Sequence, residues 1–253
     1  MAESLILSDA WRERLERPLS EKGLALLWDE ASPLPGGRGT ARLARILDWA
    51  FVLKREARGG LSRRFLPDRY ARRTPFQREW ADANLAAGAG LCPRPAARSY
   101  VHSGPFFAVY TLTEEVTGGR SLTDLLDGEA PPPWKAAGEA LARLHRLGLV
   151  HGDLNAGNVM VGPSGGILFL DFRHSRREGP PPSAPSRRDN LDRLSRSVFK
   201  ETWRRRLPFP RAFPGLLAEG YAQGWGSRED WLRGWADAPS VPGVLRRALW
   251  TRF

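Results

Sequence analysis

Short apolar runs broken by Gly/Pro turns dominate the N-terminal half of the chain. The runs with β-type character are residues 24–28 (LALLW), 41–46 (ARLARI), 50–54 (AFVLK), 96–101 (AARSYV) and 106–112 (FFAVYTL). Runs of this length, bounded by turns such as PLPGGRGT, are typical of β-strands. We therefore expect a sheet between residues 24 and 113.

One helix is predicted to interrupt these strands. It begins at TPFQREWADANLAA, where Thr74 is a good N-cap, Pro75 suits the first helical position and Gln77 can close a capping box. This start places Glu79 in the first turns of the helix.

The second half of the chain has helical periodicity. Ser121 is a predicted helix cap, and residues 134–147 carry apolar positions and a histidine at helical spacing, namely Ala137, Leu141, Leu144 and His145. Residues 177–189 (REGPPPSAPSRRD) are predicted to form a Pro/Ser loop, and residues 190–203 an amphipathic helix.

These elements predict an α+β, bilobal architecture. Residues 1–113 form a sheet-rich N-terminal lobe with one helix, residues 114–119 a hinge, and residues 120–253 a mainly helical C-terminal lobe. A cleft between two lobes is the natural place for a ligand.

The stretch LVHGDLNAGNVMV (149–161) concentrates polar side chains between two apolar edges. A turn at PSGG would pair the strand after Asn158 with ILFLDF, and so bring Asn158 close to Asp171. An amide oxygen and a carboxylate suit Mg²⁺, which takes its remaining ligands from water and phosphate. Asp153 would face the same point as a proton acceptor for an attacking hydroxyl, with His151 in the same catalytic loop.

Residues in the N-terminal half complete a nucleotide site. Lys54 ends a β-run, and Glu79 in the following helix is expected to orient it toward phosphates. The Gly-rich turn GGRGT, with Gly37 and Gly39, supplies backbone N–H groups for phosphate oxygens. Glu114, at the start of the hinge, is the remaining residue expected beside the nucleotide.

Each of these signals alone has a simpler explanation. H-x-D-x-x-x-x-N can be a set of turn-capping residues, Gly-rich turns are common, and Lys54 with Glu79 could be an ordinary surface pair. Together, in this order along the chain, they are typical of a protein-kinase-like fold that uses ATP and Mg²⁺.

Composition and charge limit the classes of binding partner that the protein is expected to have. The 253 residues carry a formal net charge of +11, almost wholly from arginine, since the lysines are only Lys22, Lys54, Lys135 and Lys200. Positive charge favours anionic partners, although base composition of the genome could also explain the arginine usage. The single cysteine, Cys92, excludes an intrachain disulfide, and the N-terminal sequence predicts neither a signal peptide nor a membrane span. We expect a cytoplasmic protein that can lie on a membrane.

The sequence resembles the bacterial lipopolysaccharide kinases, most closely the Kdo (3-deoxy-D-manno-octulosonic acid) kinase family. The resemblance lies in GRGT, FVLKREARGGLSRRFLPDRY, TPFQREW, LTEEVTGGRSLTDLL, LARLHRLGLVHGDLNAGNVMV, LFLDFRHSR and NLDRLSRSVFK, which span residues 37 to about 200. The chain departs from the family at Arg173, where an acidic residue is usual after Asp-Phe; this leaves the number of metal ions open.

The resemblance implies ATP-dependent phosphorylation of the 4-hydroxyl of Kdo on a lipid A precursor, at the cytoplasmic face of the inner membrane. It implies Asp153 as catalytic base, Asn158 and Asp171 as Mg²⁺ ligands, and Lys54 with Glu79 as the phosphate-binding pair. An anionic glycolipid suits the arginine loop, and Arg63, Arg64 and Arg69 are the predicted acceptor-binding residues.

Three other functions remain open. An aminoglycoside- or choline-type phosphotransferase shares the HGDL pattern, but such enzymes line their acceptor sites with acidic residues. A protein kinase lacks support because no A-P-E sequence follows Asp171. A pseudokinase or a basic nucleic-acid-binding protein is disfavoured by the complete catalytic set and by the absence of a nucleic-acid motif, so we expect no nucleic-acid partner.

Overall fold

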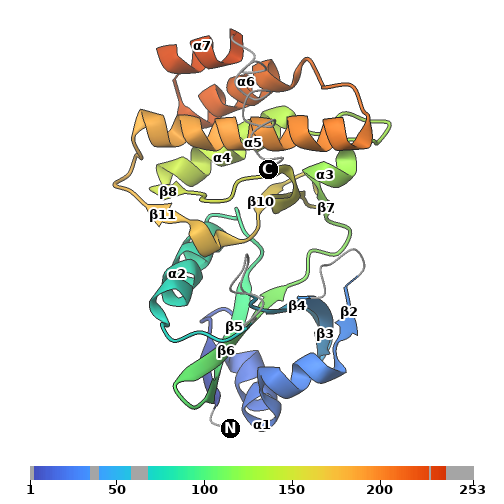
Figure 1. Ribbon diagram of the computed structural model, residues 1–253, viewed down its shortest axis with the longest axis vertical. Helices are drawn as coiled ribbons and strands as arrows, with labels where there is room; N and C mark the ends of the chain where they lie inside the picture. The colour runs from blue at the N-terminus through green and yellow to red at the C-terminus, as the bar shows by residue number, and fades with distance from the viewer. Residues whose placement is uncertain (1–2, 35–39, 58–67, 228, 238–253) are drawn as a thin grey trace. The chain divides into compact units, whose positions relative to one another are not determined.

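The computed structural model describes residues 3–34, 40–57, 68–227 and 229–237 (Figure 1). The chain divides into two compact units. Unit 1 comprises Met1–Ala87 and Pro93–Glu115, and unit 2 comprises Gly88–Cys92 and Val116–Phe253. Helices and antiparallel strands occur together in the molecule, which confirms the predicted α+β class.

Unit 1 is built on an antiparallel sheet with strand order β1-β5-β6-β4-β3-β2. The strands are β1 (Glu3–Leu7), β2 (Ser32–Pro33), β3 (Ala41–Ile46), β4 (Trp49–Arg55), β5 (Pro95–Ser103) and β6 (Phe106–Glu114), and the helices are α1 (Arg12–Glu30) and α2 (Thr74–Gly88). Four of the five predicted β-runs therefore lie in strands.

Helices α1 and α2 pack on opposite faces of this sheet. Leu112 on β6 packs in the core cluster that contains Leu15 and Leu27 of α1, whereas Val109 on β6 packs in the cluster that contains Phe76 of α2. Residues 109 and 112 are separated by an odd number of positions, and alternate residues of a strand face opposite sides. The register of β6 thus fixes which face each helix covers.

The prediction of one helix and of a strand at 24–28 in this half was wrong. Those five residues form the last part of α1, which turns at Gly23, where φ is +72°. The carboxylate of Glu3 accepts a hydrogen bond of 2.9 Å from the Leu24 N–H and so caps the segment after the turn. A five-residue apolar run carries no periodicity that separates a strand from a buried helix.

The helix starts also differ slightly from those predicted. The Arg73 carbonyl accepts from the Gln77 N–H at 3.0 Å, so α2 begins one residue earlier than a cap at Thr74 would place it. Helix α5 (Ala184–Arg205) begins inside the predicted Pro/Ser loop, with Ser183 as its N-cap. A proline in the first helical turn is compatible with this start, because the N–H that it lacks would have no helical partner.

Unit 2 is mainly helical. Its other helices are α3 (Leu122–Leu125), α4 (Trp134–Arg146), α6 (Phe213–Trp225) and α7 (Asp230–Asp237), and its short strands are β7 (Arg120–Ser121), β8 (Leu149–Val150), β9 (Val159–Val161), β10 (Ile167–Phe169) and β11 (Arg176–Arg177). The predicted cap at Ser121 is confirmed as a full capping box with Asp124. Helix α4 buries the predicted apolar positions.

Helices α4 and α6 lie close together because both carry glycine where they meet. A Cβ at Gly138 would overlap the backbone of Leu217, and a Cβ at Gly220 would overlap the backbone of Lys135. This contact lies in the N-terminal half of α4, and from the C-terminal end of the helix the chain continues into β8 and the polar loop beyond it (Figure 1).

Candidate active site

The polar stretch singled out in the sequence forms a loop held at both ends by short antiparallel pairs. Strand β8 pairs with β11 before the loop, and β9 pairs with β10 after it. A single 3₁₀ turn, η2 (Ala156–Asn158), lies between them. We call residues 151–158 the catalytic loop.

Asn155 organises the middle of the catalytic loop. Its Oδ1 accepts hydrogen bonds from the backbone N–H groups of Gly157 (3.0 Å) and Asn158 (3.1 Å). Its Nδ2 lies 3.1 Å from the Asp153 carbonyl oxygen and 3.3 Å from Asp153 Oδ2. The exposed carboxylate of Asp153 is therefore oriented by a neighbour two residues away. The sequence prediction did not include Asn155, although an asparagine that caps the next turn is a recognisable local signal.

The Asn158 amide has a defined orientation. Its Nδ2 donates to the Asp153 carbonyl oxygen at 2.8 Å, which leaves Oδ1 as the end of the amide that can coordinate a cation. In the same residue the backbone carbonyl accepts from the Leu170 N–H at 2.9 Å. Asn158 thus links the catalytic loop to the end of β10.

The hairpin predicted between Asn158 and Asp171 is confirmed. Val159 pairs with Phe169, so Asn158 lies opposite Leu170 and Asp171 is the next residue. Asp171 is exposed and has left-handed backbone angles (φ 62°, ψ 73°). Asparagine and aspartate tolerate this conformation better than most residues, and it turns the chain sharply at the end of the strand.

The oxygens of Asn158 and Asp171 form a donor set that fits Mg²⁺. Both are hard ligands, they come from neighbouring positions of one hairpin, and Mg²⁺ commonly binds one or two protein oxygens together with water and phosphate. Within the described residues, no group of three or more His, Cys, Asp or Glu side chains could hold a metal ion. Water and phosphate oxygens are the usual remaining ligands of a Mg²⁺ ion held by one or two protein oxygens.

Gly152 allows the catalytic loop to approach η3 (Phe172–His174). A Cβ at residue 152 would overlap the carbonyl group of His174. The residue between His151 and Asp153 therefore has to be small, and the loop packs directly against the backbone that follows Asp171.

His151 is buried, and its contacts are those of a positioning residue. Its ring Nε2 lies 2.9 Å from the Leu170 carbonyl oxygen and donates a hydrogen bond to it, since a carbonyl can only accept. The ring also lies edge-on to Phe172, with centroids 5.2 Å apart. Burial lowers the pKa of His151, which favours the neutral ring. His151 therefore joins the catalytic loop to the segment that carries Asp171.

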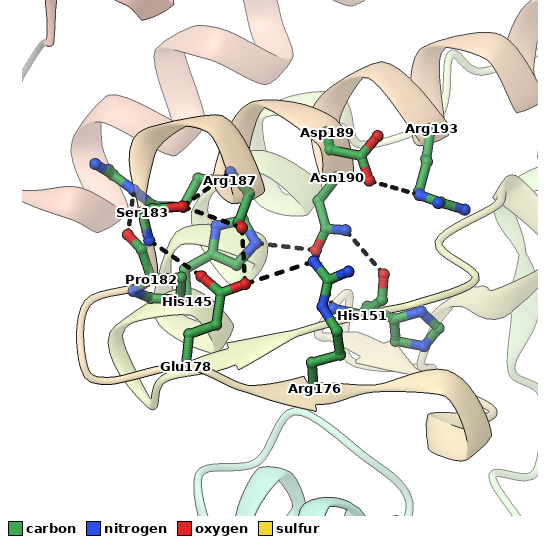
Figure 2. A network of polar contacts seen from close by, with 11 residues as sticks. His145, His151, Arg176, Glu178, Pro182, Ser183, Arg187, Asp189, Asn190 and Arg193 are labelled. Carbon is green, nitrogen blue, oxygen red and sulfur yellow. Dashed lines mark hydrogen bonds and ion pairs between the residues drawn. The ribbon is translucent and has the colours of Figure 1, made fainter.

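A side chain far away in the sequence fixes the backbone of His151. Asn190 on α5 accepts from the His151 N–H at 3.0 Å and donates to the His151 carbonyl at 2.8 Å (Figure 2). Its Oδ1 also lies 3.0 Å from Nε2 of His145 on α4, and the other ring nitrogen of His145 lies 2.7 Å from the Tyr221 hydroxyl.

The directions of these hydrogen bonds follow from Asn190. Its Oδ1 can only accept, so Nε2 of His145 carries the proton, Nδ1 accepts, and the Tyr221 hydroxyl donates. Burial lowers the pKa of His145 to about 4, in agreement with a neutral ring. Helices α4, α5 and α6 thus hold the backbone of the catalytic loop through one connected network, which we call the Asn190 network.

Lys54 and Glu79 both lie in unit 1. Lys54 is on β4, and its Nζ is 3.4 Å from Oε2 of Glu56, a fully buried residue. Glu79 is on α2, where its carboxylate lies 3.3 Å from the buried guanidinium of Arg98. Glu56 was not among the residues predicted for the site, although residues two apart in an extended chain share a face. Glu114 is the last residue of β6.

Four predicted binding residues lie outside the described residues: Gly37, Gly39, Arg63 and Arg64. Arg69 is described and half-buried, and it directly precedes Tyr70, which pairs with Phe107 in an isolated β-bridge.

Residues 33–208 match the family described as "Lipopolysaccharide kinase (Kdo/WaaP) family". The chain belongs to this family. It is 33% identical to a 3-deoxy-D-manno-octulosonic acid kinase of Stenotrophomonas maltophilia over 197 residues, which cover 75% of this chain and 78% of that protein. It is 30% identical to a protein of the same description from Photobacterium profundum over 208 residues, or 78% and 86% of the two chains.

Membership of the lipopolysaccharide kinase family associates the geometry of this loop with phosphoryl transfer. The match includes the catalytic loop, Asp171, Lys54, Glu79 and Asn190. The enzyme is a kinase that transfers a phosphoryl group to a sugar hydroxyl. Among the helices that the structure describes, none combines the length and the apolar character needed to cross a bilayer.

Proposed function

We propose that this family member transfers the γ-phosphoryl group of ATP to the 4-hydroxyl of Kdo on a lipid A precursor. The observation that carries the proposal is the catalytic loop, in which Asn155 orients the exposed carboxylate of Asp153 and Asn158 presents an amide oxygen beside Asp171. Similarity to proteins described as 3-deoxy-D-manno-octulosonic acid kinases supports the choice of sugar.

In this proposal Asp153 binds the acceptor hydroxyl of the sugar. An exposed carboxylate accepts the hydrogen bond of the sugar hydroxyl, aligns its oxygen for attack and takes its proton as the bond to phosphorus forms. The contact from Asn155 keeps the carboxylate in one orientation. A group held in this way raises the rate because little further ordering is needed during the reaction.

Asn158 and Asp171 would hold Mg²⁺ through one oxygen each. When bound, Mg²⁺ neutralises the charge of the phosphate oxygens. Lys54 is the phosphate-binding lysine in this proposal. Glu56, 3.4 Å from its Nζ, is one carboxylate that orients the ammonium group, and Glu79 is the second proposed partner. Gly37, Gly39 and Glu114 complete the proposed nucleotide site, and residues 114–119 form the hinge between the lobes.

The charge of the protein suits the proposed acceptor. A net charge of +11, supplied almost entirely by arginine, attracts a glycolipid that bears phosphates and a sugar carboxylate. Arg63, Arg64 and Arg69 are proposed to contact this acceptor. We place the reaction at the cytoplasmic face of the inner membrane, where a lipid-linked sugar and ATP can meet.

A panel of acceptors tests the proposed function. The purified protein is incubated with ATP, Mg²⁺ and either Kdo-lipid A, heptosylated core, an aminoglycoside or a generic protein substrate. The expected result is phosphate incorporation into Kdo-lipid A, with NMR showing the ester on the 4-oxygen of Kdo. Transfer to the aminoglycoside in preference to Kdo-lipid A would contradict the proposal.

A further inference from the structure

The C-terminal end of α5 exposes an aromatic side chain to solvent. Trp203 is 68% exposed, and no large apolar side chain in the described part of the chain is more exposed. Its ring is nearly parallel to that of Phe199, one turn earlier, with centroids 6.4 Å apart and an angle of 19°. Phe199 contacts Phe209 (6.1 Å), which contacts the buried Phe213 (5.9 Å). A row of aromatic rings thus supports Trp203 from the core outward.

Basic residues dominate the sequence on both sides of this tryptophan. Residues 200–211 contain one acidic residue, Glu201, and five basic residues, namely Lys200, Arg204, Arg205, Arg206 and Arg211. All of these basic residues except Arg205 are exposed. Glu201 is 2.6 Å from Arg204, and Arg205 also pairs with Asp127 on the segment after α3 at 3.0 Å. The two acidic partners leave the end of the helix with an excess of positive charge.

The same helix touches the catalytic loop. The Ala156 N–H donates to the hydroxyl of Ser197 on α5 at 2.9 Å. Arg204 lies seven residues farther along, which is two helical turns, so it is on the same side of the helix and about 10 Å away. In Figure 1 this end of α5 lies beside α3, in agreement with the Arg205–Asp127 contact. A surface bound here would be close to the loop that bears Asp153.

We propose that Trp203 and the exposed Lys200, Arg204, Arg206 and Arg211 form a surface that docks on an anionic lipid membrane. We call it the α5 surface. Tryptophan is favoured at the boundary between water and lipid, where its ring is half-immersed and its N–H stays near the headgroups. Arginine binds phosphate oxygens in pairs, and each basic residue near an anionic leaflet adds to the attraction. A purely solvated helix end has no need of an exposed tryptophan among arginines.

This docking rests on the proposed function, because it explains how a lipid-linked acceptor is brought to the catalytic loop. The helix would lie with its C-terminal end on the membrane, and the acceptor sugar would extend from the headgroup layer toward Asp153. The complementary charges favour an anionic bilayer over a second, equally basic copy of the chain.

Vesicle sedimentation tests the α5 surface. The full chain is centrifuged with vesicles of phosphatidylcholine alone or mixed with phosphatidylglycerol, at low and high salt. The double variant Trp203→Ala/Arg204→Ala should bind the mixed vesicles more than about tenfold more weakly than the unchanged protein. The matched control is Leu47→Ala/Arg45→Ala, which removes an apolar side chain that is 67% exposed and an exposed arginine from unit 1. The control should bind normally.

Several results would overturn the α5 surface. These are normal vesicle binding by the Trp203→Ala/Arg204→Ala variant, equal loss in the control, and equal binding of the unchanged protein to vesicles with and without phosphatidylglycerol. A change in oligomeric mass in the Trp203 variant, without a change in vesicle binding, would assign the surface to a second copy instead.

A separate assay distinguishes failure of the surface from failure of the proposed function. Phosphate transfer to a water-soluble Kdo saccharide is measured without vesicles. The docking variant should retain this transfer but show a raised apparent KM for Kdo-lipid A in vesicles. If the unchanged protein transfers no phosphate to either acceptor, the proposed function fails. The sedimentation result alone then shows whether the α5 surface binds anionic vesicles.

Discussion

Replacement of Asn190 tests how the catalytic loop is held. Its buried side chain makes three hydrogen bonds, two with the backbone of His151 and one with His145. Asn190→Leu removes all three and leaves three buried polar groups without a partner. Asn190→Asp keeps an acceptor for the His151 N–H and for His145, replaces the donor to the His151 carbonyl by a second carboxylate oxygen, and places a buried negative charge beside His145.

The two variants should differ clearly in stability. A buried polar group without a partner costs about 1–3 kcal/mol, so Asn190→Leu should lose roughly 3–9 kcal/mol of unfolding free energy. Loss on this scale approaches the whole stability of a typical domain, which is about 5–15 kcal/mol. Asn190→Asp leaves one carbonyl without a donor, so the loss from hydrogen bonding should be about 1–3 kcal/mol. This variant should still fold and can be assayed.

Asn190→Asp should also slow catalysis. The lost bond frees the backbone at His151, two residues before Asp153, and a displacement of about 1 Å at a reacting group can lower the rate up to about 100-fold. We expect kcat to fall about 10- to 100-fold while KM for ATP changes little, measured by steady-state kinetics with each substrate varied in turn. Urea unfolding of the same samples gives the stability.

The matched control is Asn84→Asp on α2, because Asn84 also donates from Nδ2 to a backbone carbonyl, that of Trp80, at 2.8 Å. It should lose stability without the specific fall in kcat. If Asn190→Asp turned over at the normal rate and showed only a lower melting temperature, Asn190 would be a structural residue with no part in positioning the loop.

Three further predictions concern single groups of unit 2. Asp153→Asn should lower turnover about 10²–10⁴-fold with ATP binding retained, because an amide cannot take the hydroxyl proton; near-normal turnover would remove Asp153 from the mechanism. Asp171→Ala should weaken Mg-ATP binding, measured by titration, because only Asn158 then remains as a ligand; unchanged affinity and turnover would show that the metal assignment is wrong. Acidification from pH 6.5 to about 4 should remove about 3 kcal/mol of stability through His145. Its neutral form in the folded state means that the unfolded chain alone binds the proton over this range, so urea unfolding of His145→Gln should show a smaller dependence on pH.

The catalytic loop could be predicted from the sequence because its geometry is local. A four-residue turn closes the hairpin, and antiparallel register then places Asn158 opposite Leu170 and next to Asp171. Lys54 and Glu56 are two residues apart and so share one face of an extended chain, which is an equally local relation. Glu56 could therefore have been predicted as a partner of Lys54, in addition to Glu79. Local spacing thus determines which side chains share a strand face or a turn.

Helix α1 could not be predicted from its apolar run. The segment 24–28 has the length and composition of a strand, and Pro18 and Gly23 interrupt the helical pattern before it. The turn at Gly23 is stabilised by Glu3, a residue on a different element. Whether such a run is a helix or a strand is therefore decided by packing and capping partners that periodicity does not reveal.

The Asn190 network could not be predicted from the sequence, because its members are far apart along the chain. Asn190 is 39 residues from His151 and Tyr221 is 76 residues from His145, and nothing in the local sequence of either marks it as a partner. What joins them is burial, since each polar group removed from water must find a partner, and helices α4, α5 and α6 bring these groups within hydrogen-bond distance of one another. The residues proposed to contact substrate, Asp153 and Asp171, are exposed at turns and can be recognised by motif. The residues that position the catalytic loop are determined by contacts in the protein interior, so they can be identified only when the fold is known.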